Sequence, residues 1–275
     1  MISVKSSRYI FLDSRDCEKI NGDYCSDVYI NLNETISVNH EVDILFELVD
    51  LTMPNSIYNI NETNNVLNLS VSSTDPDNGV TSVTNCYYNV PAGFYTASTL
   101  VTTLSAQEDN YLDFAYNNNT QKITMLFPDN ATLFEISDTS TIITVDVDIL
   151  GFNFANVLEE LQLPNSVYEL EDVVNLVQTQ VLYIRAVDLM TTNITTKEKQ
   201  RGNIIASIPL NSTFGNVFYY SPYNSRPSKL ESKMIKQIRL QILDSNFDLV
   251  NLQGGDWNAT FYLSFVYNRG RDLSN

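Results

Sequence analysis

Hydrophobic and polar residues alternate with a period of two along much of the chain. In residues 42–48, for example, four apolar side chains fall on one side while Asp43 and Glu47 fall on the other. Because successive side chains of a strand point to opposite faces, this pattern predicts strands with one buried face and one face open to water or to a partner. The same alternation occurs in residues 28–32, 67–71 and 182–186.

The clearest strand signal comes from two segments near the end of the sequence, residues 235–243 and 259–267. In the first, three apolar residues alternate with polar ones, and the second places five apolar residues on one face. A loop that contains Gly254-Gly255 separates them. We expect this closing strand pair to lie in a sheet with one buried face. Further short strands are expected at residues 111–116, 122–127, 132–136, 142–147, 204–209 and 217–220.

One stretch in the first half follows a helical period instead. A single apolar stripe at positions i, i+3, i+4 and i+7 is formed by Ala97, Leu100, Val101 and Leu104. This spacing predicts a short amphipathic helix. Residues 154–161 are compatible with a second one.

Many short strands, few helices and long loops predict a mainly β protein, built as a β-sandwich or jelly roll. An α/β enzyme would alternate its strands with helices of ten or more residues, which this sequence does not do. With 275 residues, of which 43% are hydrophobic, the chain is long enough to bury a sizeable core.

Neither a membrane span nor a secretion signal is expected. The longest apolar runs are too short to cross a bilayer, and residues 1–9 lack the apolar core of a signal peptide. These features predict a soluble protein that is made in the cytoplasm. The three cysteines, Cys17, Cys25 and Cys86, are read as free thiols in a reducing compartment, in preference to a Cys17–Cys25 bridge.

The net charge of −17 is unevenly distributed along the chain. Residues 1–196 hold 6 Lys+Arg and 27 Asp+Glu, a net of −21, whereas residues 197–275 hold 10 and 6, a net of +4. Such an acidic chain is a poor general binder of nucleic acid, because most of its surface would repel phosphate. The asymmetry has two explanations, which are chance combined with solubility, or oppositely charged faces that meet between neighbouring subunits.

The residues needed for catalysis are scarce. His40 is the only histidine and lies in a polar stretch before a strand, where we expect a surface residue and not a catalytic base. The usual zinc sites also need more histidines or clustered cysteines. Pairs of acids such as Glu159-Glu160 carry no weight among 33 carboxylates. We therefore expect no enzyme activity, no metal and no cofactor.

The chain is rich in aromatic residues, with 16 tyrosines and 13 phenylalanines. Most are expected in the core or on sheet faces. Those in polar stretches, such as Tyr219 and Tyr220, are candidates for a subunit interface, because aromatic residues are enriched in such contacts.

Seven segments are similar to segments of a known protein family in their amino-acid sequence and in their order along the chain. In chain order they are residues 7–16 (SRYIFLDSRD), 42–61 (VDILFELVDLTMPNSIYNIN), 90–96 (VPAGFYT), 150–152 (LGF), 204–209 (IIASIP), 218–220 (FYY) and 252–257 (LQGGDW). Together they resemble the penton (minor capsid, vertex) proteins of virophages, related mobile elements and giant DNA viruses, over nearly the whole chain. These are structural segments, so the resemblance supplies no catalytic residue.

The resemblance implies a structural capsid protein with a single jelly roll, which forms a homopentamer at the five-fold vertices of an icosahedral virion. Its partners would be copies of itself, the surrounding major capsid protein and other minor capsid or vertex proteins, with no specific nucleic-acid binding. A simple jelly roll needs well under 275 residues. We therefore expect residues 1–80 and 170–275 to form it, and residues 81–169 to be an inserted, mostly β subdomain that carries the short helix.

A ring of five joins one face of each subunit to a different face of the next. Because the charge is split along the chain, we expect residues 197–239 to contribute strongly to these contacts, through Lys229, Lys233 and Lys236 in particular.

Two other functions are considered. A carbohydrate- or receptor-binding jelly roll of a virion fibre or spike would stack sugars on exposed aromatic residues, and Trp257, the only tryptophan, could serve. A glycoside hydrolase on a β scaffold would need a specific carboxylate pair, which the sequence does not identify.

Overall fold

The computed structural model divides the chain into two compact units. The jelly-roll unit consists of Met1–Ile57 and Thr179–Asn275, and the inserted unit is Tyr58–Gln178. No helix in the described part of the chain is long and apolar enough to cross a membrane. The structure describes residues 4–62, 64–74, 81–107, 113–126, 141–146, 158–161, 167–169, 176, 179–189, 203–224 and 226–267.

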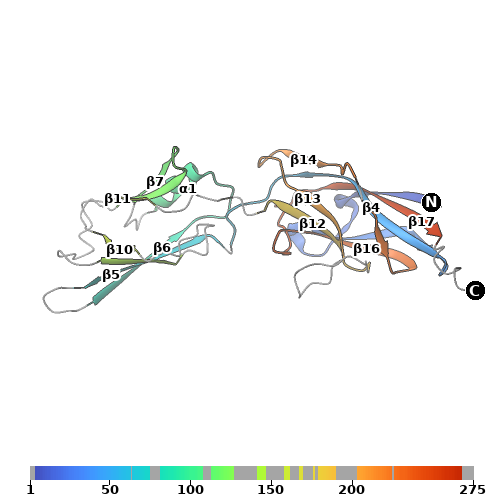
Figure 1. Ribbon diagram of the computed structural model, residues 1–275, viewed down its shortest axis with the longest axis horizontal. Coiled ribbons are helices and arrows are strands. Elements are labelled where there is room, and N and C mark those ends of the chain that lie inside the picture. The colour runs from blue at the N-terminus through green and yellow to red at the C-terminus, as the bar shows by residue number, and fades with distance from the viewer. Residues whose placement is uncertain are drawn as a thin grey trace, which may run out of the picture. The chain divides into compact units, whose positions relative to one another are not determined.

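Two antiparallel sheets form the jelly-roll unit (Figure 1). The first sheet has the order β1-β17-β4-β14, with β15 also paired to β4, and its strands are Val4–Asp13, Asn258–Tyr267, Val42–Pro54, Val217–Tyr220 and Ser228–Leu230, respectively. The second sheet has the order β13-β12-β16-β3-β2, and its strands are Ile204–Pro209, Val181–Ala186, Met234–Leu243, Asp27–Ser37 and Glu18–Lys19. Two short 3-10 turns occupy Ser14–Asp16 and Gly22–Tyr24.

The inner faces of the two sheets share one hydrophobic core. Phe46 of β4 stacks on Phe261 of β17 with ring centroids 5.0 Å apart, and both are fully buried in a cluster that also contains Leu240 of β16 in the opposite sheet. Burying a side chain of this size stabilises the fold by about 1.5–3 kcal/mol. The predicted fold class, a mainly β jelly-roll sandwich with an inserted β unit, is confirmed.

The two closing segments are strands, as predicted, but they do not share a sheet. β16 pairs with β12 and β3, whereas β17 pairs with β1 and β4. Residues 244–257 between them are far longer than a hairpin loop, and they carry the chain from one sheet to the other. The apolar faces of the two strands therefore meet across the core.

The inserted unit contains two small sheets and the helix α1, Ala97–Ser105. The sheet of order β10-β9-β5-β6 uses Leu158–Leu161, Thr141–Asp146, Val66–Thr74 and Thr81–Asn89. The sheet of order β11-β8-β7 uses Val167–Glu169, Lys122–Leu126 and Asp113–Asn117. The helix suggested for residues 154–161 is corrected in part, because β10 pairs antiparallel with β9. Residues 132–136 and 154–157 lie outside the described residues.

The predicted helix is confirmed, and its sequence explains where it begins. Thr96 and Thr99 form a capping box, in which the Thr99 N–H donates to Thr96 Oγ1 at 3.2 Å and the Thr96 N–H donates to Thr99 Oγ1 at 2.9 Å. The stripe residues Leu100, Val101 and Leu104 are buried.

The contacts place the boundaries of the inserted unit differently from the sequence analysis, which gave residues 81–169. β5, assigned there to the jelly roll, pairs with β6 from Val66 to Thr74 and also with β9. Strand alternation predicts that a strand has a buried face, but it does not specify the partner that covers its edge.

Candidate subunit interface

Two of the three predicted interface lysines bind a carboxylate of their own chain. Lys229 Nζ lies 2.6 Å from Asp43 Oδ2, and Lys233 Nζ lies 2.9 Å from Asp43 Oδ1. Lys233 also donates to the carbonyl oxygen of Val42 at 2.8 Å. Desolvation raises the pKa of Asp43, but the two ammonium groups outweigh it, so the pKa lies below the usual value. These two lysines therefore fasten β15 and the segment before β16 to β4.

Lys236 differs from the other two lysines. It is exposed and has no ion-pair partner within the described ranges. It lies where the register between β16 and β3 shifts, between Ile235 and Gln237, beside Met234, whose side chain is 66% exposed. Of the three predicted lysines, Lys236 is thus the one that is exposed without an ion-pair partner among the described residues.

The two candidate tyrosines also differ. Tyr219 of β14 is 65% exposed and adjoins Val217, which is 70% exposed. Tyr220 is half-buried, and its hydroxyl donates to the carbonyl oxygen of Ser207 at 3.4 Å. Tyr219 is therefore available for an intermolecular contact, whereas Tyr220 already bridges β14 and β13.

Among the described residues of the jelly-roll unit, the most buried charged side chain was not found by sequence reasoning. Asp27, 1% exposed, accepts from Arg239 Nε at 2.9 Å and from Arg239 Nη2 at 2.7 Å. It also accepts from Gln241 at 2.9 Å and from Asn21 at 3.0 Å. A buried carboxylate needs such partners to offset its lost hydration. Asp27 and Arg239 are 212 residues apart, so no local sequence pattern predicts that they form a pair.

Two arginines flank this carboxylate on the outer face of the second sheet. The hydrogen bonds to Asp27 raise the pKa of Arg239, whose guanidinium also lies 5.6 Å from the ring centroid of Tyr29. Arg185 donates to Gln241 Oε1, and burial lowers its pKa, with Arg239 acting in the same direction and Asp27 opposing. With two guanidinium groups and one carboxylate, this part of the sheet carries a net positive charge.

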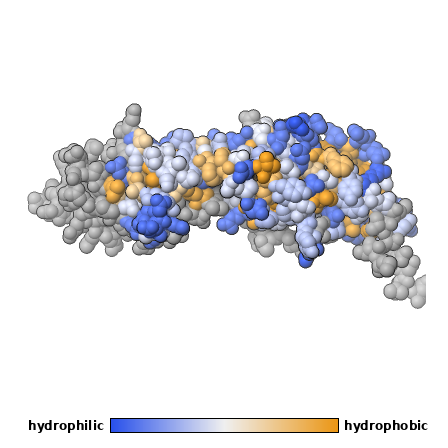
Figure 2. All heavy atoms as spheres, turned by 90° about the horizontal axis from the view of Figure 1, so that it is seen from above, coloured by the Kyte–Doolittle hydropathy of each residue, from blue (hydrophilic) through white to orange (hydrophobic). Residues whose placement is uncertain are grey.

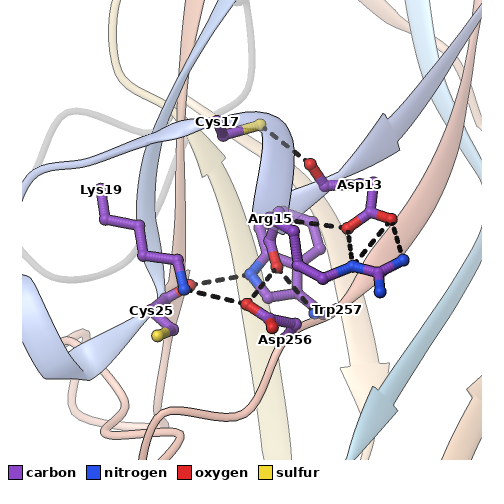
Figure 3. A network of polar contacts seen from close by, with 8 residues as sticks. Asp13, Arg15, Cys17, Lys19, Cys25, Asp256 and Trp257 are labelled. Carbon is purple, nitrogen blue, oxygen red and sulfur yellow. Dashed lines mark hydrogen bonds and ion pairs between the residues drawn. The ribbon is translucent and has the colours of Figure 1, made fainter.

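Trp257, considered above for stacking a sugar, is fully buried. Its indole Nε1–H donates to the carbonyl oxygen of Cys25 at 2.8 Å, and its backbone N–H donates to Ser14 Oγ at 2.9 Å (Figure 3). Asp256 beside it binds Lys19 Nζ at 2.9 Å. The ring therefore offers no exposed face to a carbohydrate, and the residue anchors β17 to the segment after β1.

The glycines before Trp257 are explained by the backbone. A Cβ atom on Gly255 would lie 2.7 Å from Pro54 Cγ and 2.8 Å from the carbonyl oxygen of Leu252, and Gly254 has a φ of +75°. Ser56 Oγ donates to the same carbonyl oxygen at 2.5 Å. Residues 252–257 thus fix the approach of the chain to β4 and to Trp257, which is a structural role.

A search for chemistry among the described residues gives little. No group of three or more His, Cys, Asp or Glu that could hold a metal ion occurs there. His40 is exposed in a turn, as predicted, and Cys17 and Cys25 are free thiols. A cavity of about 300 Å³ opens at the edge of the sandwich, where Arg8 of β1 pairs with Glu34 of β3. It is lined mainly by hydroxyl and aliphatic groups, including Thr35 and Val42.

The fold and its contacts define a class of protein, namely a jelly-roll sandwich with a second β unit inserted between β4 and β12, in which the polar clusters hold segments together. No family model matches the sequence, and neither does any curated protein. Among solved structures, the crystal structure of the selenomethionine-labelled mavirus penton protein is similar to this chain, with a TM-score of 0.50 and 14% sequence identity. The match covers 94% of this chain and 99% of that chain. The protein therefore has a penton-like jelly-roll fold.

Proposed function

We propose that this protein is a structural capsid protein, a penton that closes the five-fold vertices of an icosahedral virion as a homopentamer. In this role it contacts the surrounding major capsid protein and is located in the virion, after synthesis in the host cytoplasm. The proposal extends to the virophage and giant DNA virus lineage, on the strength of the seven sequence segments described above.

The observation that carries the proposal is the extent of the structural likeness. A jelly roll alone is shared by proteins of many functions, so it would say little. Here the likeness to the mavirus penton protein covers 94% of the chain and therefore includes both the sandwich and the inserted unit. The two-unit organisation is a more specific feature than the sandwich.

The motif residues support a structural role in the same way. Within residues 252–257, Gly255 permits a close approach to Pro54, and Trp257 fills the core. In residues 7–16, Ser14 binds the backbone of Trp257. Three of the segments that resemble the penton family, residues 7–16, 42–61 and 252–257, thus hold one another in place, and the proposal assigns no segment a catalytic role.

The carbohydrate-binding alternative has lost its supporting observation. It relied on an exposed Trp257, and this side chain is fully buried. We therefore do not propose it as a second function.

The test is the mass and symmetry of the native particle. The purified chain, of 31.1 kDa, should form a species of five subunits in light scattering, and class averages in electron microscopy should show a five-fold ring. A chain that stays monomeric at a concentration of roughly tens of micromolar would contradict the proposal, because specific interfaces usually have lower dissociation constants.

A further inference from the structure

An aromatic surface lies on the outer face of the first sheet. Phe11 and Tyr9 of the edge strand β1 are 80% and 58% exposed. Their rings stack with centroids 6.1 Å apart, and Tyr9 also lies 4.9 Å from Tyr262 of β17. Val217 and Tyr219 lie at the opposite margin of the same sheet, on β14. We call these five residues the aromatic face.

Exposure to water alone does not account for aromatic residues on the outer face of this sheet. An antiparallel sheet with one face in water normally places polar residues there, and β1 instead alternates buried Leu12 with exposed Phe11. Figure 2 shows hydrophobic residues breaking an otherwise hydrophilic surface in several places. Exposed aromatic residues on a sheet whose edge strand has no second partner among the described strands mark a contact site.

A carboxylate lies between the two aromatic margins. The register places Asp50 of β4 opposite Thr260 of β17, which in turn lies opposite Phe11. Asp50 is half-buried and has no ion-pair partner in the part of the chain that the structure describes. A surface that fits the aromatic face should therefore combine apolar groups with a positive charge.

The outer face of the second sheet has that composition. Met234, Lys236 and Gln237 are exposed on β16 while Ile235 and Ile238 point into the core. Arg239 follows on the same side and belongs to the pair of arginines around Asp27. We call Met234, Lys236, Gln237 and Arg239 the basic face. A thioether packs well against aromatic rings, and the ammonium group of Lys236, which has no ion-pair partner among the described residues, complements Asp50.

We propose that the aromatic face of one copy packs against the basic face of the next copy in the ring. The contact is heterologous, since it joins two different surfaces, and such contacts can close into a ring. A sheet four strands wide at ~4.8 Å and ten residues long at ~3.3 Å offers roughly 600 Å², which approaches the ~800 Å² per partner of a standard interface. This inference rests on the proposed function, because it assigns the surfaces through which the homopentamer forms.

The first test exchanges charges between the two faces of the full-length chain. Lys236→Glu and Asp50→Lys should each weaken ring formation by roughly tenfold or more, because like charges then meet. The double variant reverses both faces and should restore the ring that each single variant loses. Lys122→Glu in the inserted unit is the matched control and should leave the ring unchanged. Subunit mass by light scattering over a dilution series is the readout.

The second test concerns the apolar contact. Phe11→Ser should shift the particle toward monomers, whereas Tyr223→Ser, which changes a 99% exposed aromatic outside both faces, should not. In a chain with Phe11→Cys and Met234→Cys, a short bismaleimide should give a ladder of two to five linked subunits. Each single cysteine variant controls for the native thiols.

The outcomes separate the two proposals. A wild-type ring that survives Lys236→Glu and Phe11→Ser, with no ladder in the double cysteine variant, overturns these surfaces and leaves the penton proposal standing. Linkage between the residue-11 cysteines of two copies of the Phe11→Cys variant overturns the heterologous contact, since it means that like faces meet. A wild-type chain that stays monomeric overturns both proposals.

Discussion

The two units of this protein differ sharply in charge. The jelly-roll unit holds 15 Lys+Arg and 17 Asp+Glu, a net of −2, whereas the inserted unit holds 1 and 16, a net of −15. Along the sequence the same charges looked like an acidic front and a basic end. In the fold, bases from the C-terminal part bind acids from the N-terminal part inside the jelly roll, as Arg239 binds Asp27 and Lys233 binds Asp43.

This difference teaches that charge asymmetry along a chain does not translate directly into charged surfaces. Lys229 and Lys233 are partly satisfied within their own subunit, which leaves Lys236 as the lysine that we assign to a contact between subunits. The inserted unit has one base, Lys122, for sixteen acids. In the homopentamer that we propose, five such acidic units would repel each other, and salt would screen that repulsion.

The largest expected effect comes from breaking the buried ion pair of the jelly-roll unit. Asp27→Ala leaves Arg239 and Gln241 without their shared acceptor, so the free energy of unfolding should fall by about 3 kcal/mol, the lower end for a buried pair because Arg239 keeps some exposure. Urea unfolding measures this loss. Hydrogen exchange followed by mass spectrometry should place it in β16 and β3 and leave α1 unchanged.

Asp13→Ala is the matched control. Asp13 also binds an arginine through both oxygens, and hydrogen bonds from Arg15 lower its pKa to about 2, but the pair lies at the surface. Water replaces the lost partner there, so stability should be indistinguishable from wild type. Equal losses of unfolding free energy in the two variants would mean that burial does not determine how much Asp27 contributes to stability. Faster hydrogen exchange in both units of the Asp27→Ala variant would show that the two units unfold together.

A smaller effect is expected from acid. Because the pKa of Asp43 is lowered in the folded state, its pairing with Lys229 and Lys233 stabilises the jelly roll at pH values above the unfolded pKa, near 3.8. That stability is lost as the pH falls below 3.8 toward the folded pKa. Asp43→Asn should lower stability at neutral pH and flatten this acid dependence in urea unfolding measured from roughly pH 5 down to roughly pH 2, a range that includes the lowered folded pKa values of paired carboxylates. An unchanged slope would contradict the assignment.

The smallest expected effect tests the inserted unit. Thr96→Ala removes the capping box of α1 and should cost about 1 kcal/mol of local stability. Hydrogen exchange should rise in α1, while β16 and β17 keep their protection. Thr96→Ser retains the hydroxyl and should behave like wild type. If hydrogen-exchange protection also falls in β16 and β17, the result contradicts the division of the chain into two units that the contacts indicate.

Sequence patterns predicted the elements of this fold better than their partners. The period-two segments around Val42 and Ile184 are strands, and the stripe from Ala97 to Leu104 is a helix, because burial on one face is written into local spacing. The same spacing could not reveal that β16 and β17 belong to opposite sheets. Nor could it assign β5 to the inserted unit, since any apolar face can be covered by several partners.

The candidate interface follows the same rule. Sequence reasoning identified Lys236 and Tyr219, and the structure leaves both exposed. It also selected Trp257 for a surface role, which the burial of this side chain contradicts. The position of Trp257, between a glycine-containing loop and a strand, is compatible with an exposed loop residue as well as with a core residue. It missed Phe11 and Tyr9, although their alternation with Ile10 and Leu12 makes both faces of β1 apolar, a signal that was present in the sequence.

By itself, the sequence determined that this is a β-rich chain with an amphipathic helix near residues 97–104, an acidic charge and a set of segments similar to those of penton proteins. These properties depend on residues that are near one another in the chain. Only the tertiary structure decided which charges neutralise each other and which aromatic residues remain at the surface. Asp27 meets Arg239 across 212 residues, and Phe11 is 80% exposed because it lies on the outer face of the first sheet. Such facts depend on strand order, which local spacing does not encode.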